Sequence, residues 1–145
     1  MQPGSFGSRP TFPASIGSQV FFSADLFGHG RELFLTDGTQ AGTVQVTNTL
    51  PAGEPGGLVA FGSGVVFSND GPNGREPWLS DGTPAGTFEL RDIRVGANDS
   101  IGLLQEDFTV AGAQVFFSAN DGTTGEELWV TDGTAAGTRL VVDLA

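Results

Sequence analysis

The sequence contains no cysteine, no lysine and no tyrosine, and its single histidine is His29. The lack of cysteine excludes disulfides, thiolate zinc sites and a cysteine nucleophile. The side chains left for chemistry are carboxylates and hydroxyls. No apolar run approaches the ~18 residues of a membrane-spanning helix. The first eight residues lack the basic start and apolar core of a signal peptide, so we expect any export signal to lie outside this sequence.

Positive charge is also scarce, because the six basic residues are all arginine and the formal net charge is −11. A surface this acidic repels nucleic-acid phosphates and anionic lipid. We therefore expect no nucleic-acid partner and no membrane insertion. Glycine is abundant instead, and the glycines recur between apolar runs, which is typical of turns between strands.

The dominant feature is a repeat, Asp-Gly-Thr-x-Ala-Gly-Thr, which occurs at 37–43, 81–87 and 132–138. Apolar runs recur around each copy and predict four short strands per repeat. The expected strands are 11–16, 19–24, 32–36 and 43–48, then 57–61, 64–69, 76–80 and 87–92, and finally 107–111, 114–119, 127–131 and 138–143. We expect residues 1–8 to form a flexible tail and residues 9–145 one domain, with repeats at about 9–50, 51–94 and 95–145.

The faces of these strands predict the fold. The second and third strands carry large apolar side chains on both faces, so they should be covered on both sides. In the fourth strand, Phe88 and Leu90 alternate with Glu89 and Arg91, which indicates an outer strand wetted on one face. Four antiparallel strands per repeat of this length are typical of β-propeller blades. The expected fold is all-β, with three blades as half of a six-bladed ring; a β-trefoil or β-prism is the alternative.

The repeated loop itself has a structural interpretation. Its Asp can accept hydrogen bonds from backbone amides two or three residues on, its Thr can cap the turn, and its two glycines can supply positive φ. The third strand of each repeat, which directly precedes this loop, carries an aromatic residue. These repeat-signature residues are Asp37, Gly38, Thr39, Gly42, Asp81, Gly82, Thr83, Gly86, Asp132, Gly133, Thr134, Gly137, Phe34, Trp78 and Trp129.

In the last repeat, the third strand and the loop after it read EELWVTDGTAAGT at 126–138. This segment resembles the ELWxxDGTxxGT repeats found in tandem in large secreted or surface proteins of bacteria. The third copy matches closely, whereas the second has Pro77 in place of leucine and the first has Phe34 in place of tryptophan. The resemblance implies an exported, propeller-like repeat protein. It implies no catalytic, binding or metal-ligating residue.

Carboxylates are the remaining candidates for catalysis. Glu32, Glu76 and Glu127 occupy equivalent positions, and a carboxylate pair can hydrolyse glycosides. A residue that recurs in every repeat usually serves the fold, so we expect no catalytic residue and no enzyme; a hydrolase is a distant alternative.

The loops between second and third strands hold Asp25, Asp70 and Asp121, each near glycine. This pattern suits turns, and it also occurs in calcium loops, but one carboxylate per loop is few for calcium. We expect no metal site and no cofactor, with calcium as the alternative.

His29 has no histidine counterpart in the other repeats and is expected to lie in a surface loop. Trp78 and Trp129 are expected to be buried between blades; if exposed they could stack on a sugar.

Three blades are fewer than the four to eight of closed propellers. We expect an open arc to expose apolar residues such as Phe21, Phe34, Phe116 or Trp129. Exposed apolar surface drives association, so the predicted function is a non-catalytic interaction module that forms a head-to-tail homodimer. The alternative is a lectin-like module for a glycan or a protein ligand, with calcium assistance. Either would be secreted or on the cell surface.

Overall fold

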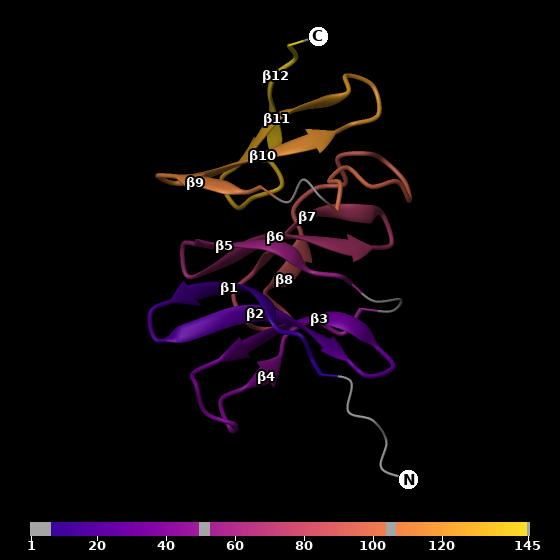
Figure 1. The fold of residues 1–145 in the computed structure, drawn as a ribbon. Coiled ribbons are helices and arrows are strands. Elements are labelled where there is room, and N and C mark those ends of the chain that lie inside the picture. The colour runs from indigo at the N-terminus through magenta and orange to yellow at the C-terminus, as the bar shows by residue number, and fades with distance from the viewer. Residues whose placement is uncertain (1–6, 50–52, 104–106, 145) are drawn as a thin grey trace.

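The computed structural model describes residues 7–49, 53–103 and 107–144, and these fold into three four-stranded antiparallel sheets (Figure 1). Sheet 1 contains β1 (Thr11–Ile16), β2 (Gln19–Leu26), β3 (Gly30–Thr36) and β4 (Val44–Gln45). Sheet 2 contains β5 (Gly56–Phe61), β6 (Gly64–Gly71), β7 (Gly74–Ser80) and β8 (Thr87–Glu89). Sheet 3 contains β9 (Thr109–Ala111), β10 (Gln114–Asn120), β11 (Glu126–Thr131) and β12 (Arg139–Val142). In the described part of the chain, no helix is long and apolar enough to cross a membrane.

Each sheet is a simple meander in which neighbours in sequence are neighbours in space. The predicted three repeats of four strands are therefore confirmed. The trefoil and prism alternatives are wrong, because the three sheets stack face to face like the blades of a propeller (Figure 1). The prediction was poorest for the fourth strands, which are shorter than expected. Phe88 lies in one of them and is 44% exposed, whereas Leu90, expected on the same face of the same strand, lies beyond the end of β8 and is 1% exposed.

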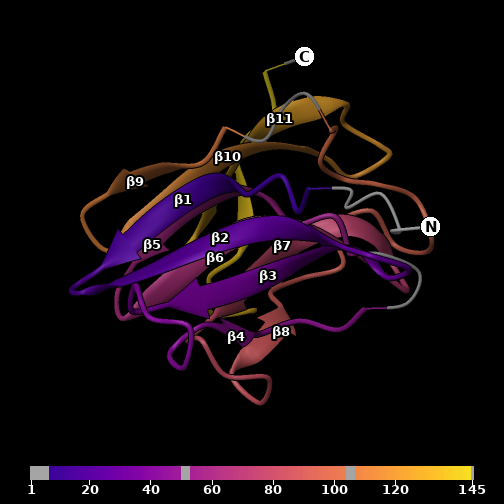
Figure 2. The same ribbon diagram turned by 60° about the horizontal axis from the view of Figure 1, so that its bottom comes forward.

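The three sheets stack face to face, as the indigo, magenta and orange layers of Figure 1 show. The first strands approach one another, with β1 next to β5 and β5 next to β9. Figure 2 shows the same layers from another side, with β1, β2 and β3 crossing over the strands of sheet 2. The sheets therefore fan out from a shared side formed by their first strands.

The stack has a direction, because at both junctions the same face of one sheet packs on the opposite face of the next. We call the face that carries Phe21 and Leu35 in sheet 1, and their counterparts in the other sheets, the forward face. The opposite face, which carries Phe22 and Phe34 in sheet 1, is the rear face. The forward face of sheet 1 packs on the rear face of sheet 2, and the forward face of sheet 2 packs on the rear face of sheet 3.

Two hydrophobic cores fill these junctions. The first joins Phe21, Leu33 and Leu35 of sheet 1 to Val65 and Phe67 of sheet 2. The second joins the other face of sheet 2 to sheet 3 and contains Val66, Val115, Phe117 and Trp129, together with Leu90, Ile93, Ile101 and Phe108 from the connecting segment and the start of sheet 3. The prediction of strands covered on both sides is thus fulfilled in the middle sheet, where Val65, Val66 and Phe67 all have 0% exposure.

The direction of the stack corrects the list of residues expected to be exposed. Phe21 is only 2% exposed and Trp129 only 5%, because both face the middle sheet. Phe34 and Phe116 lie on the outer faces and are partly exposed, as expected. The strand pattern alone could not distinguish these cases, since both faces of the second and third strands are apolar.

Several sequence predictions fall partly on residues outside the described ranges. The flexible tail expected at 1–8 lies mostly there. The start of the repeat expected at 51–94 and residues 104–106 of the repeat expected at 95–145 also lie there.

Candidate functional site

The signature loops are rigid hydrogen-bonded turns, and all three have the same geometry. In the second, Asp81 Oδ1 accepts the Thr83 amide at 2.8 Å and the Thr83 hydroxyl at 2.7 Å. The same hydroxyl oxygen then accepts the Gly86 amide at 3.0 Å. The Thr83 side chain, followed by its backbone amide, holds the pKa of Asp81 below its usual value. Asp37 and Asp132 have the same partners in Thr39 and Thr134, with the same effect on their pKa values.

The two glycines of each loop serve different purposes, which corrects one prediction. Gly38, Gly82 and Gly133 have the expected positive φ, at 91°, 93° and 88°. The second glycines, Gly42, Gly86 and Gly137, do not. Each instead lies against the carboxylate of its own loop: a Cβ at Gly86 would lie 2.1 Å from Asp81 Oδ1. Glycine is therefore required there by close approach and not by backbone conformation.

The first glycine of the loop also forms part of the contact between sheets. A Cβ at Gly82 would lie 2.8 Å from Leu35 Cδ2 on the forward face of sheet 1. A Cβ at Gly133 would lie 3.2 Å from Leu79 Cδ1 on the forward face of sheet 2. At Gly38, the counterpart in sheet 1, a Cβ would meet nothing within 4 Å. The same loop surface is thus covered at two places in the chain and open at the third.

The repeated glutamates accept hydrogen bonds from backbone amides. Each accepts an amide from the residue 17 positions later, which are Thr49 for Glu32, Ile93 for Glu76 and Leu144 for Glu127. Glu32 and Glu76 have 0% exposure. These carboxylates hold the segment that leaves each fourth strand against its own third strand.

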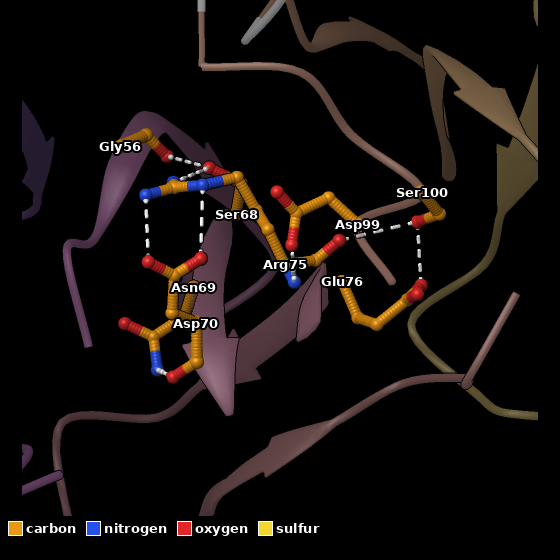
Figure 3. A network of polar contacts seen from close by, with 8 residues as sticks. All are labelled: Gly56, Ser68, Asn69, Asp70, Arg75, Glu76, Asp99 and Ser100. Carbon is orange, nitrogen blue, oxygen red and sulfur yellow. Dashed lines mark hydrogen bonds and ion pairs between the residues drawn. The ribbon is translucent and has the colours of Figure 1, made fainter. Parts of the chain in front are cut away.

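Glu76 belongs to a network of polar contacts that also includes Arg75, Asp99 and Ser100 (Figure 3). Ser100 donates its hydroxyl to Glu76 Oε2 at 2.5 Å, and its amide donates to the Arg75 carbonyl at 3.0 Å. The Ser100 carbonyl accepts the Asn120 amide of sheet 3 at 2.9 Å. Burial raises the pKa of Glu76 to about 7, although the donors from Ser100, Ile93 and Arg94 oppose that rise. The network joins sheet 2 to sheet 3 through the connecting segment.

Arg75 lies in the same network and has a counterpart in sheet 1. Its Nε is 3.1 Å from Asp70 Oδ1, and its Nη1 donates to the Ser68 hydroxyl at 2.9 Å. Arg31 makes the equivalent ion pair with Asp25, at 3.3 Å. Asp25 and Asp70, considered above as calcium ligands, are therefore engaged with arginine across their hairpins.

The other loop candidates are also accounted for by turn chemistry. Asp121 Oδ1 accepts the amides of Thr124 and Thr123, both at 2.8 Å, and these bonds lower its pKa to about 2. His29 is exposed in the turn between β2 and β3. Within 7–49, 53–103 and 107–144, no three His, Cys, Asp or Glu side chains gather into a group able to hold a metal.

The three aromatic residues of the signature all lie on the rear faces of their sheets, but they are not equally buried. Trp129 is buried against sheet 2, and the Arg91 guanidinium lies over its ring. Trp78 packs against the core shared with sheet 1, yet it remains partly exposed and lines a cavity. Phe34 lies on the rear face of sheet 1, stacked on Phe22 with ring centroids 5.5 Å apart.

The two outer faces of the stack are the forward face of sheet 3 and the rear face of sheet 1. Each is equivalent to a face that packs against another sheet inside the stack. Leu33 and Leu128 occupy equivalent positions on the forward faces of sheets 1 and 3. Leu33 has 0% exposure beneath sheet 2, whereas Leu128 is 42% exposed. On the rear faces, Phe67 and Phe117 have 0% and 2% exposure, while their counterpart Phe22 is only partly buried. The sequence had revealed the apolar positions but not which of them a neighbour covers.

No family model and no curated protein sequence matches this chain. Two of the solved structures that share its fold are TolB proteins. TolB from Acinetobacter baumannii superimposes with a TM-score of 0.61 at 15% identity, over 97% of this chain and 33% of that one. A putative TolB from Agrobacterium tumefaciens superimposes with a TM-score of 0.64 at 12% identity, over 97% of this chain and 51% of that one.

TolB is a β-propeller. The present chain has the fold of a β-propeller fragment. It spans a third to a half of the length of the two TolB structures, and its sheets correspond to blades. At this level of identity the similarity establishes the fold, and the outer faces of sheets 1 and 3 are the features from which a function can be argued.

Proposed function

We propose that this chain is a non-catalytic interaction module in which two copies associate head to tail, the forward face of sheet 3 meeting the rear face of sheet 1. The observation that carries the proposal is the repeated junction within the chain. The same pair of faces meets twice, between sheets 1 and 2 and between sheets 2 and 3. The forward face of sheet 3 and the rear face of sheet 1 are left without a partner sheet, and they are the same two kinds of face that pack together at each junction.

The residues on the outer faces fit this arrangement. Leu128 and the partly exposed Phe116 of sheet 3 would take the positions that Leu33 and Phe21 take against sheet 2. Gly38 would receive a neighbouring side chain as Gly82 and Gly133 do. A further blade of the same repeat would fit these faces equally well, and for the chain of 145 residues the partner we propose is a second copy.

Two copies of three blades give a six-bladed ring with two-fold symmetry, which is within the size range of closed propellers. The two junctions between copies are then identical, so each apolar contact counts twice. A non-catalytic function is favoured because the buried carboxylates and arginines described above are engaged in holding the fold. Neither of the solved neighbours is named as an enzyme. We place the module outside the cytoplasm, as its resemblance to secreted repeat proteins implies.

Sedimentation velocity on variants tests the proposal. Leu128→Asp puts a charge in both junctions of a dimer, and we expect the dimer dissociation constant to rise by roughly 100-fold or more, since burying each leucine contributes about 1.5–3 kcal/mol. The matched control is Val95→Asp, because Val95 is 85% exposed in the segment after sheet 2 and lies on neither outer face. Equal sedimentation of the two variants would contradict the proposal.

A further inference from the structure

A cavity of about 390 Å³ opens at the junction of sheets 1 and 2, within a single chain. Its volume lies in the range of small-ligand sites. One wall comes from the segment that leaves β4, and the other from Trp78 and the signature loop of sheet 2. The lining residues are Gln45, Val46, Thr47, Asn48, Thr49, Trp78, Pro84 and Thr87.

The next junction shows what fits at this position. There, the Arg91 guanidinium carbon lies 5.8 Å from the centre of the Trp129 ring. Its Nη1 donates to the Thr138 carbonyl at 2.7 Å. A planar cation thus lies over the indole and binds a backbone carbonyl between sheets 2 and 3.

The repeat makes the two junctions comparable residue by residue. Thr49 and Ile93 donate their amides to the equivalent glutamates, Glu32 and Glu76. Thr47 and Arg91, two residues before them, are therefore counterparts. Trp78 and Thr87 correspond in the same way to Trp129 and Thr138, which lie at matching positions of their signature motifs.

Thr47 leaves the first junction open. Its side chain is short, and its hydroxyl turns inward to donate to Glu32 Oε2 at 2.6 Å and to accept the Leu33 amide at 2.8 Å. Nothing in sheet 1 takes the position of the Arg91 guanidinium. This accounts for the cavity beside Trp78, and for the partial exposure of Trp78 where Trp129 is only 5% exposed.

We propose that this cavity binds a guanidinium group, supplied by the side chain of an arginine, in the place that Arg91 occupies at the next junction. The indole of Trp78 is the strongest type of ring for a cation. Asn48 and Gln45 carry amide oxygens that accept hydrogen bonds. Glu89 pairs across the strands with Trp78, and the net charge of −11 attracts cations to the chain. The guanidinium is preferred to an ammonium because it is planar and stacks. The site is independent of ring completion, because both its walls belong to one chain.

The test uses isotope-labelled protein and follows the two indole N–H signals by nuclear magnetic resonance during titration. The probes are free arginine and the peptide Gly-Arg-Gly, with Gly-Lys-Gly and Gly-citrulline-Gly as controls. We expect both arginine probes to shift the Trp78 signal while that of Trp129 stays unchanged, and the two controls to bind about tenfold more weakly or worse. Comparison of free arginine with the peptide separates an amino-acid ligand from a peptide ligand. Equal binding of the lysine or citrulline peptide, or no shift of the Trp78 signal with either arginine probe, would overturn the proposal.

Two exchange variants sharpen the test. Thr47→Arg supplies the guanidinium from within the chain, so it should abolish binding at Trp78. Arg91→Thr empties the second junction, so it should create a second binding event that shifts Trp129. Arg91 is exposed and outside the first cavity, which makes the second variant a safe choice if Thr47→Arg disturbs Glu32. Failure of the folded Arg91→Thr chain to gain a site would contradict the proposed chemistry.

Discussion

At the scale of single residues, the signature loop shows both what sequence patterns reveal and where they stop. The Asx turn could be predicted because Asp, Gly and Thr recur together, and each has a known place in such a turn. The purpose of the second glycine could not, because a glycine needed for positive φ and one needed for close approach look the same in a sequence. Only the position of the Asp81 carboxylate against Gly86 distinguishes them.

This distinction can be tested with a double-mutant cycle. Gly86→Ala places a methyl group where the Asp81 carboxylate lies, and we expect it to cost about 2 kcal/mol of unfolding free energy. Asp81→Ala removes the carboxylate, so in the double variant the alanine at 86 should be tolerated. Urea denaturation of the four chains measures the coupling, expected at about 1 kcal/mol or more. Additive losses would show that Gly86 is required for another reason.

At the scale of elements, each third strand is tied to the segment that follows its fourth strand. The equivalence of Glu32, Glu76 and Glu127 indicated a structural role, and the structure supplies the partners, which are backbone amides 17 residues on. The sequence could not reveal these partners, because the fourth strands end earlier than their apolar pattern suggests. Ser100, which binds Glu76 and also joins sheet 3, had no pattern that marked it.

The raised pKa of Glu76 predicts a dependence of stability on pH. Burial moves this pKa from 4.5 to about 7 in the folded chain. Between these values the folded chain binds the proton more readily than the unfolded chain, so the stability that this site contributes is present at low pH and is lost as pH rises toward 7.

Glu76→Gln removes this titration and isolates it from the other acidic groups. We expect the midpoint of thermal unfolding of the wild type, relative to that of the variant, to fall by several degrees from pH 4.5 to pH 7.5. The test is how the difference between the two unfolding midpoints changes with pH, and not its size at any one pH. A difference that stays flat or rises across this interval would show that the pKa of Glu76 in the folded chain is at or below its ordinary value.

At the scale of the whole molecule, three sheets stack with a constant direction and leave two complementary faces. The number of repeats, their four strands and their propeller character could be predicted from spacing and alternation. The direction of stacking could not, because Phe21 and Phe22 are adjacent, similar and both apolar. Their exposure separates them: Phe21 is covered by sheet 2, while Phe22 faces outward.

The two junctions share this direction but differ in their side chains. Trp129 is covered by Arg91, and Trp78 borders a cavity because Thr47 is short. Val142 in β12 is the counterpart of Thr47 and Arg91, because each lies two residues before the amide that binds the repeated glutamate. In the ring, Val142 of a second copy would therefore meet Phe34 as Arg91 meets Trp129. Val142 is 40% exposed, as the ring proposal requires of a residue that a partner covers.

The central claim is that the outer faces of sheets 1 and 3 complete the same junction that the chain already forms twice. Its most direct test is the mass of the unmodified chain in solution, measured by light scattering from low to high micromolar concentration. The ring predicts a discrete species of twice the 14.9 kDa chain mass that does not grow further as concentration rises. A single species at 14.9 kDa over the whole range, or a series of ever larger polymers, would contradict it.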